Sequence, residues 1–459
     1  MTEQKRSPLG SAQYPAPSWD TLAAQDSRAI PAVLREDTYS YLGSEALATE
    51  RYTSPEFFQR EIDKMWPNVW QFAARDEELP QEGDLVVYEN AGRSYLLIRQ
   101  HDGAVRAFHN VCLHRGRKLR TQNGRVKDLV CPFHGFTWKR DGALKEIPCR
   151  WDFEHLKDGN MRLPEASVGR WGGYIFVREN DTGPTLEEYL APLPEHFKLW
   201  PHEDCYTRAW VGKVIPANWK VTAEAFMEAW HSNNTHPQIR AFTGDVNTKY
   251  NIYGDHINVA ITPFGVPSPE LDMTDRDQRW VLDQYLKYNG RVGGPGVKID
   301  LPEGATARSA MGEFNRKRFG KDFGRDMNAV SDAELQDALT YNVFPNFSPW
   351  GGFTPNVVYR WRPWPDVGHT LMEVRLLQRL APGQPAPPSP AMNLLGADQP
   401  WSAAKELSVL GDVLQQDMNN LPYVQEGLRA SKTGAVNLAN YQEIRIRHFH
   451  QTLDKYLAR

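Results

Sequence analysis

The chain has 459 residues, of which 41% are hydrophobic, 11% aromatic and 24% charged. This composition is typical of a folded globular protein with one large or two ordinary domains, and it excludes a disordered or collagen-like chain. Because 53 basic residues are balanced by 57 acidic ones, the net charge is -4 and no overall basic field favours nucleic acid as a partner. No apolar run approaches the roughly 18 residues of a membrane helix, and the N-terminus has no hydrophobic signal core, so we expect a cytoplasmic protein that does not enter the membrane.

The first part of the chain is predicted to pass from an arm through a helix into a small all-β domain. Residues 1–37 are rich in Pro, Ser, Ala and charge without a steady apolar period, which indicates an extended arm or a partly disordered tail. A helix is predicted over 54–65, where Ser54 can cap the first turn and apolar residues recur at helical spacing. From Trp70, short β-like runs separated by Asp-Gly turns predict an all-β domain. The runs that we expect to be strands are 84–89, 95–99, 105–111 and 173–177.

The rest of the chain, after a polar linker at 180–184, mixes long helices with β-like runs and predicts an α+β domain. Residues 289–325 begin with a Gly-rich stretch and continue with many Lys and Arg residues, which indicates a long loop. The Gly-rich stretch lacks the strand-to-helix context of a dinucleotide-binding loop, so we expect the chain itself to bind neither NAD nor flavin. The β-like runs of this domain are 251–262, 357–361 and 370–377.

Two short motifs in the β domain each combine one cysteine with one histidine. Cys112 and His114 are two positions apart, and sixteen residues later Cys131 and His134 are three positions apart. Two cysteines on one iron and two histidines on the other are the ligands of one kind of [2Fe-2S] cluster. A structural zinc site is the alternative, although zinc motifs usually keep like residues together. Glycines after both histidines, and three aromatic residues that can shield the site, favour the cluster: Phe133, Phe136 and Trp138.

A second candidate metal site begins with two histidines in the α+β domain. A helix predicted over 220–231 places Glu224, Glu228 and His231 on one face. His236 follows just before a proline that should end the helix, so both imidazoles can converge on one ion if the helix breaks there. A solvated helix surface is the alternative interpretation of this pattern.

An acidic residue interrupts an apolar stripe near the C-terminus. In a helix predicted over 402–425, Asp417 occupies the face on which every other residue of the stripe is apolar. A carboxylate on a core face is costly unless it is paired or bound to a metal, so a salt bridge to an arginine is the alternative. Together with His231 and His236, this carboxylate completes the two-histidine, one-carboxylate ligand set of non-heme Fe(II) oxygenases.

With both sites, the chain resembles the large (alpha) subunits of Rieske non-heme iron oxygenases, the aromatic-ring-hydroxylating family. The resemblance runs from about residue 40 to the C-terminus and includes Asn218-Trp219-Lys220, Phe344-Pro345-Asn346 and Gln425-Glu426-Gly427-Leu428. It implies an α+β fold with an all-β Rieske [2Fe-2S] domain and a helix-grip catalytic domain, in which helices wrap an antiparallel sheet. The bounds that we expect are 1–67 for an N-terminal arm and helix packing on the catalytic domain, 68–180 for the Rieske domain and 181–459 for the mononuclear iron domain.

The resemblance also implies an activity. The chain would be a terminal oxygenase that activates O2 at a mononuclear Fe(II), with electrons from the Rieske cluster, to hydroxylate an apolar, aromatic or other cyclic small molecule. The implied ligands are Cys112, His114, Cys131 and His134 for the cluster, and His231, His236 and Asp417 for the Fe(II).

The implied assembly is a homotrimer or an alpha3beta3 complex, in which electrons pass between neighbouring subunits. Glu228 would bridge His134 of one subunit to His231 of the next. A separate NAD(P)H-dependent reductase would supply the electrons, with or without a ferredoxin.

The sequence departs from many ring dioxygenases at the second site. Those dioxygenases have Asp-x-Tyr-His where this chain has Glu228-Ala229-Trp230-His231. Similar Glu-x-aromatic-His motifs occur among relatives that oxidise non-aromatic substrates. A Rieske monooxygenase that acts by demethylation or quaternary amine oxidation is therefore one alternative. A non-catalytic Rieske electron carrier and a zinc-stabilised binding module are two others.

An apolar substrate cavity is expected beside the second site. For each of its expected lining residues, packing in the core is the alternative: Phe226, Met227, Phe264, Phe344 and Phe347. We interpret His448 and His450 as ordinary polar positions in a terminal helix, and we expect Cys149 and Cys205 to be buried free thiols.

Overall fold

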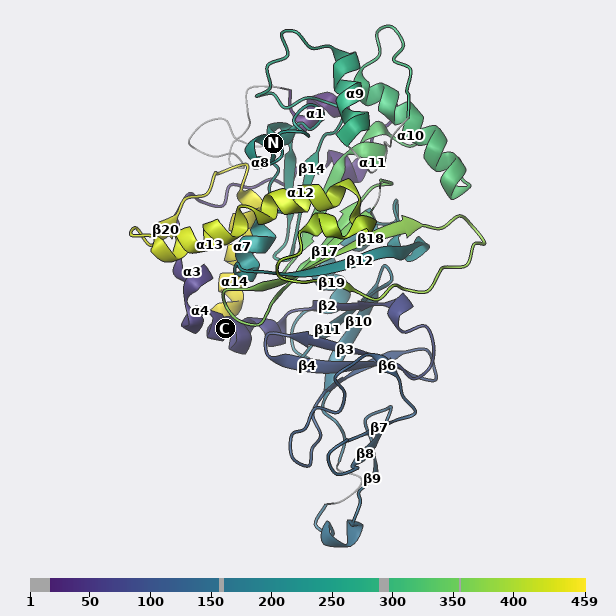
Figure 1. Ribbon diagram of the computed structural model, residues 1–459, viewed down its shortest axis with the longest axis vertical. Helices are drawn as coiled ribbons and strands as arrows, with labels where there is room; N and C mark the ends of the chain where they lie inside the picture. The colour runs from purple at the N-terminus through teal and green to yellow at the C-terminus, as the bar shows by residue number, and fades with distance from the viewer. Residues whose placement is uncertain (1–16, 157–160, 289–296, 355) are drawn as a thin grey trace. The chain divides into compact units, whose positions relative to one another are not determined.

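The structure is a computed structural model that describes residues 17–156, 161–288, 297–354 and 356–459 (Figure 1). The contacts divide these residues into two compact units. One contains the described residues up to Phe58 together with Leu190–Ala458, and the other contains Gln59–Tyr189. Within the described ranges, no helix has the length and apolar character needed to cross a bilayer.

The smaller unit, Gln59–Tyr189, is built on an antiparallel sheet of seven strands in the order β2-β11-β10-β5-β4-β3-β6. Its strands are β2 Gln71–Arg75, β3 Asp84–Asn90, β4 Arg93–Arg99, β5 Val105–His109, β6 Gly124–Arg125, β10 Glu165–Trp171 and β11 Tyr174–Arg178. A second sheet of three strands consists of β7 Asp128–Val130, β8 Thr137–Lys139 and β9 Leu144–Glu146. The predicted all-β domain is confirmed, and each predicted strand agrees with an observed one to within two residues.

Turns and packing in this unit follow from its sequence. The two Asp-Gly turns place Gly103 and Gly142 at φ of 81° and 82°, in the left-handed region that glycine adopts without a steric penalty. One apolar cluster gathers side chains of both sheets, and it also contains Cys112 and Cys131. The predicted cysteine ligands therefore lie in the core of the unit rather than on its surface.

The larger unit is centred on an eight-stranded sheet in the order β13-β14-β15-β16-β17-β18-β12-β19. Neighbouring strands are antiparallel except β12 and β19, which are parallel. The strands are β12 Cys205–Ile215, β13 Lys249–Tyr253, β14 Ile257–Thr262, β15 Ala338–Val343, β16 Phe347–Gly351, β17 Asn356–Pro363, β18 Thr370–Arg379 and β19 Asn393–Leu395. The runs at 357–361 and 370–377 are confirmed as β17 and β18, and the run at 251–262 folds as the hairpin of β13 and β14.

Helices cover this sheet, as predicted (Figure 1). Helix α7, Trp219–Glu224, packs on β17 and β18, while α14, Ile444–Leu457, packs on β13 and β14. Helix α13, Leu421–Ala430, packs on α7 and on α12, Val409–Met418. The other α-helices of this unit's described residues are α1 Trp19–Ala23, α2 Ala32–Arg35, α3 Glu50–Thr53, α6 Leu193–His196, α8 Ser232–Thr235, α9 Gln278–Tyr288, α10 Ala307–Phe323 and α11 Asp332–Gln336. Two more helices span the boundaries of the two units in the chain, α4 Pro55–Arg60 and α5 Leu186–Leu190.

The helix predicted over 54–65 is confirmed, since α4 continues directly into a π-helical segment over Glu61–Met65. Two other helices were predicted too long. The helix over 220–231 ends at Glu224, because Glu228 accepts a hydrogen bond from the backbone N–H of His231 at 2.9 Å and starts a new turn there. The helix over 402–425 is interrupted between α12 and α13, where Pro422 in the first turn of α13 has no N–H to continue the ladder.

The long loop predicted over 289–325 is wrong for its second half. Residues 289–296 lie outside the described part of the chain, and α10 begins at Ala307 behind a capping box formed by Thr306 and Ser309. The apolar period of α10 is obscured because polar residues on its inner face, among them Asn315 and Arg316, are buried.

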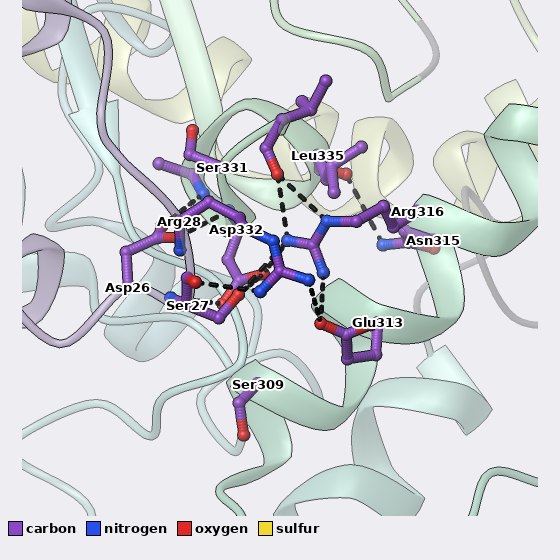
Figure 2. Close-up of polar contacts among 12 residues, drawn as sticks. Asp26, Ser27, Arg28, Ser309, Glu313, Asn315, Arg316, Ser331, Asp332 and Leu335 are labelled. Atoms are coloured by element: carbon purple, nitrogen blue, oxygen red, sulfur yellow. Dashed lines mark hydrogen bonds and ion pairs between the residues drawn. The ribbon is translucent and has the colours of Figure 1, made fainter. Parts of the chain in front are cut away.

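The described part of the N-terminal segment, residues 17–37, is not an extended arm (Figure 2). Asp26 accepts hydrogen bonds from the backbone N–H groups of Asp332 and Ala333, each at 2.9 Å. Ser27 and Arg316 both donate to the carboxylate of Asp332, at 3.0 and 2.7 Å. The segment is therefore anchored to the α10–α11 region by charged and polar contacts, and its polar composition reflects these partners rather than disorder.

Candidate metal centres and active-site cavity

The two Cys/His motifs form loops with the same backbone hydrogen bonds. The N–H of Cys112 donates to the carbonyl of Arg117, and the N–H of Gly116 donates back to Cys112, at 2.9 and 3.0 Å. In the second loop, Cys131 donates to Phe136 and Gly135 donates back to Cys131, at 2.8 and 3.0 Å. Gly116 and Gly135 have φ of 74° and 78°, so both tight turns need glycine. Two equivalent loops thus present one thiol and one imidazole each.

The side chains of the two loops lie close to one another. The imidazole rings of His114 and His134 have centroids 4.6 Å apart, and the thiols of Cys112 and Cys131 are neighbours that interact. Burial, together with the neighbouring Cys131, raises the pKa of the Cys112 thiol, so without a cation this thiol favours the protonated form. The Nδ1 atom of His114 is buried without a hydrogen-bond partner among the described residues. A donor set of two thiols and two imidazoles with one unpaired buried nitrogen fits a [2Fe-2S] cluster.

The second site brings together the three residues that the sequence pointed to. His231 and His236 flank the single turn of α8, which holds their rings 5.3 Å apart, and Asp417 comes from α12. The Oδ1 atom of Asp417 lies 3.1 Å from Nε2 of His236 and 3.5 Å from Nε2 of His231. One ligand atom from each residue falls within 4.8 Å of the other two, a spacing that a single ion can fill.

Both imidazoles are oriented by acceptors on their other nitrogen. Nδ1 of His231 contacts Oε1 of Glu228 at 2.7 Å, and Nδ1 of His236 contacts Oε1 of Gln416 at 2.9 Å. These contacts leave both Nε2 atoms directed at Asp417, which is the arrangement that metal-binding histidines require. Gln416 was not predicted, and its only sequence signal is its place beside Asp417.

The charges of this site favour a cation. Burial by itself lowers the pKa of His231, but the neighbouring carboxylates of Glu228 and Asp417 raise this pKa well above its usual value. Burial opposes the ionisation of Asp417, but hydrogen bonds from His231 and His236 hold the pKa of its carboxyl below the usual value. The carboxylates of Asp417, which is buried, and Glu228, which is partly buried, therefore attract positive charge to the imidazoles, and a divalent ion satisfies the same field.

A cavity of about 190 Å³ adjoins the second site. His231, His236 and Asp417 line it together with mostly apolar side chains, including Phe242, Phe264, Trp350, Tyr359 and Val413. Of the five residues predicted for it, Phe226 and Phe264 line the cavity. Met227, Phe344 and Phe347 do not: all three are buried elsewhere in the core, where Phe344 stacks on Tyr456.

Glu224 and Glu228 do not share a face, because the predicted helix breaks between them. Glu224 contacts Nε2 of His450 at 2.8 Å, and the hydroxyl of Tyr52 bonds to both residues. His448 and His450 were predicted to be ordinary polar positions, yet both are buried in α14 with specific partners. Of the remaining cysteines, Cys205 is buried as predicted, whereas Cys149 is exposed, contrary to prediction.

Comparison with known proteins agrees with this geometry. Residues 69–157 match the family model of the Rieske [2Fe-2S] domain. Residues 196–459, more than half of the chain, match the model of the ring hydroxylating alpha subunit (catalytic domain). The chain belongs to the family of Rieske oxygenase alpha subunits. For this alpha subunit, the predicted family, the α+β fold and the pairing of a [2Fe-2S] domain with a mononuclear-iron catalytic domain are confirmed.

Relatives of the alpha subunit differ in their named substrates. The oxygenase subunit of glycine betaine monooxygenase from Chromohalobacter salexigens is 31% identical over 199 residues, which cover 43% of this chain and 44% of the relative. The large oxygenase component of the naphthalene 1,2-dioxygenase system from Pseudomonas aeruginosa is 32% identical over 302 residues, which cover 64% of this chain and 63% of the relative. The chain thus matches about half, or somewhat more, of the length of these relatives.

A solved structure supports the fold. A quaternary ammonium Rieske monooxygenase in complex with its substrate L-carnitine superposes with a TM-score of 0.62 at 18% identity, over 90% of this chain and 95% of that one. At this identity the likeness concerns the fold alone.

Proposed function

We propose that this alpha subunit is the terminal oxygenase component of an enzyme that activates O2 at a mononuclear Fe(II) and oxidises a small organic molecule. The observation that carries the proposal is the convergence of His231, His236 and Asp417 on the wall of an apolar cavity. An electron carrier has no need for a second donor set of this kind, nor for a cavity beside it.

The residues divide into two ligand sets. The cluster would be held by Cys112, His114, Cys131 and His134, and the Fe(II) by His231, His236 and Asp417. When bound, these groups supply one-electron transfer and the activation of O2.

The protein contributes the orientation of the ligands. Glu228 and Gln416 fix the two imidazoles through their Nδ1 atoms, so that Nε2 remains available for the ion. Each oxygen of Glu228 keeps a lone pair after its bonds to the ring and backbone of His231, and a carboxylate can accept a further N–H. We propose that His134 of a neighbouring subunit supplies that N–H in a trimeric assembly, and that a separate NAD(P)H-dependent reductase supplies the electrons.

The cavity favours a substrate about the size of one ring. A dry cavity of about 150 Å³ is large enough for benzene, so about 190 Å³ leaves room for one ring and a small substituent. Its apolar lining supports an aromatic or other cyclic substrate.

Quaternary amine oxidation is the second candidate, and two observations favour it. The rings of Phe226 and Tyr359, both at the cavity, have centroids 4.8 Å apart and offer aromatic faces of the kind that bind ammonium groups. One relative is a glycine betaine monooxygenase.

The test is a screen of substrate-dependent O2 consumption with a surrogate reductase and NADPH, across arenes, phenolic ethers and quaternary amines. Iron analysis accompanies it. The proposal predicts about three iron atoms per chain, two in the cluster and one at the second site, whereas an electron carrier would hold about two. A zinc-containing, colourless protein would refute both.

A further inference from the structure

Arg445 is a buried arginine in the wall of the active-site cavity. It lies on α14, is 0% exposed, and lines the same cavity as His231, His236 and Asp417. Burial lowers the pKa of its guanidinium to about 9, so the group is still charged at neutral pH. A full positive charge is thus present in an otherwise mostly apolar cavity.

The hydrogen bonds of Arg445 leave its charge uncompensated. Its Nε donates to the side-chain oxygen of Asn258 at 2.6 Å, and Nη1 donates to the hydroxyl of Thr340 at 3.2 Å. Both acceptors are neutral, and Nη2 has no hydrogen-bond partner among the described residues. No carboxylate in the described part of the chain forms an ion pair with Arg445. Glu228 influences its charge through space, but without an ion-pair contact.

Two buried arginines of α10, in the same unit, are paired with carboxylates. Arg316 forms an ion pair with Asp332 at 2.7 Å, and Arg308 forms one with Asp337. Leaving a buried charge unpaired is costly, and proteins normally avoid it by supplying an acidic partner. Arg445 differs from these two arginines because it lacks such a partner and lines the cavity, where a ligand can supply one.

The sheet beneath the cavity becomes polar on the same side. Ala260 and Thr340 are register partners on β14 and β15, and both line the cavity. Two residues along each strand, Asn258 pairs with Asn342, so these side chains continue the same face. Both polar side-chain atoms of Asn342 are buried without a hydrogen-bond partner among the described residues. Unused hydrogen-bonding capacity therefore lies beside Asn258, one of the two partners of the guanidinium.

We propose that Arg445 binds an anionic group of the substrate, and that the substrate is therefore a small carboxylate. This inference rests on the proposed function, because it assigns the substrate class of the same cavity. The carboxylate accepts hydrogen bonds from the guanidinium, and the apolar lining holds the rest of the molecule within reach of the second metal site. An aromatic acid and a betaine share this chemistry, since each combines one carboxylate with a group that aromatic faces accommodate.

The test measures ligand binding by isothermal titration calorimetry on the purified holoenzyme, without reductant, so that turnover is not needed. Two probe pairs are compared, benzoate with benzamide and glycine betaine with choline, in each of which a neutral group replaces the carboxylate. We expect the carboxylate of one pair to bind about tenfold or more tightly than its neutral counterpart. A preference within the benzoate pair would indicate an aromatic acid as the substrate, and a preference within the glycine betaine pair would indicate a betaine.

Variants locate the preference at Arg445. Arg445→Gln should abolish it, and Arg445→Lys should keep part of it, because an ammonium retains the charge but not the planar fork. Arg447→Gln is the matched control: Arg447 is also buried on α14, at 3% exposed, but is not among the residues that line the cavity, so its variant should keep the preference. Far-ultraviolet circular dichroism and the cluster absorbance check that each variant is folded.

Two results would overturn the inference. One is equal binding of the carboxylate and neutral probes in both pairs by the parental protein, which does not depend on any variant folding. The other is a folded Arg445→Gln protein that keeps the preference. Failure of the proposed function would be seen in a different measurement. If the protein consumed no O2 with any substrate but still preferred the carboxylate probes, the oxygenase proposal would fail and Arg445 would remain a carboxylate-binding residue of another activity.

Discussion

The two candidate metal centres are assembled in different ways. The Cys/His centre draws all its ligands from residues 112–134, on two loops with the same backbone hydrogen bonds. The His/His/Asp centre joins α8 to α12, and its ligands His236 and Asp417 are 181 positions apart in the chain. The first centre is defined by local loop geometry, whereas the second exists only once the larger unit has packed its helices on the sheet.

This difference has consequences for how each centre can be disrupted. A loop closed by its own glycines and backbone bonds needs little from the rest of the chain. A site at the junction of two separate helices depends on every element that positions them. The two centres should therefore be lost separately when their ligands are replaced, and the predictions below test that separation, beginning with the largest effect.

The strongest test removes the carboxylate that joins the second site. Asp417→Ala should abolish mononuclear iron binding and reduce substrate-dependent O2 consumption to background, because two imidazoles alone bind Fe(II) poorly. The visible spectrum of the cluster should be unchanged. Iron analysis and absorbance on one sample measure both outcomes.

Asp412→Ala on the same helix is the matched control, since Asp412 is exposed in the first turn of α12. Turnover retained by Asp417→Ala would contradict the assignment and would return Asp417 to the role of a structural ion-pair partner.

The reciprocal change tests the local centre. Cys131→Ser should remove the brown colour and the electron supply, and with them turnover, while the second site keeps about one iron per chain. We expect the unit to stay folded, because its sheets and turns do not depend on the sulfur. Iron analysis with electron paramagnetic resonance follows both centres, and simultaneous loss of the second iron would show that the two centres are not independent.

The proposed link between the centres is Glu228. Glu228→Gln keeps one side-chain acceptor for Nδ1 of His231 but loses the second acceptor that the bridge to another subunit needs. We expect both metals to be retained and reoxidation of the reduced cluster to slow about tenfold or more, as measured by rapid mixing with substrate and O2. Glu426→Gln, at an exposed position of α13, is the control. Reoxidation at the parental rate would place the electron route elsewhere.

The sequence was sufficient for the first centre, because cysteine and histidine at fixed short spacing and the adjacent glycines are all local signals. It also pointed to the three residues of the second site, although both helices predicted to carry them are broken in the structure. The decisive signal was chemical rather than periodic, since a lone carboxylate on an apolar face needs a partner wherever the helix ends. Helix length could not be predicted because side-chain capping by Glu228 overrides helical spacing.

The cavity and the buried polar contacts were beyond sequence reasoning. Which of the aromatic residues line the cavity depends on the register of strands that are far apart in the chain, so Phe264 was predicted but Trp350 was not. The same limit applies to α10, whose buried Arg316 resembles a loop residue until its partner Asp332 is known. Arg445 carried no signal, because an arginine in a terminal helix is usually exposed.

The smallest expected effect distinguishes Glu224, the last residue of α7, from Glu228, which follows in the segment before α8. Glu228 belongs to the second site, whereas Glu224 is mostly buried and contacts His450 and Tyr52. Burial raises the pKa of Glu224 to about 8, so its carboxyl is protonated in the folded protein at neutral pH but ionised in the unfolded chain above about pH 4.5. The folded state then binds more protons than the unfolded state between these values, and the stability contributed by this group falls as the pH rises from about 4.5 through 8.

Glu224→Gln should remove this pH dependence, because the amide imitates the protonated carboxyl at every pH. We expect the thermal midpoint of the parental protein to fall by about 2–5 °C more than that of the variant between pH 5.5 and 8, and Glu426→Gln to behave like the parent. Glu224→Gln should keep its metals, as Glu228→Gln does, and its turnover and cluster reoxidation should change little, in contrast to Glu228→Gln. If Glu224→Gln slowed cluster reoxidation as much as Glu228→Gln, the two carboxylates would act as one network, and the second site would extend to Glu224 and its partner His450.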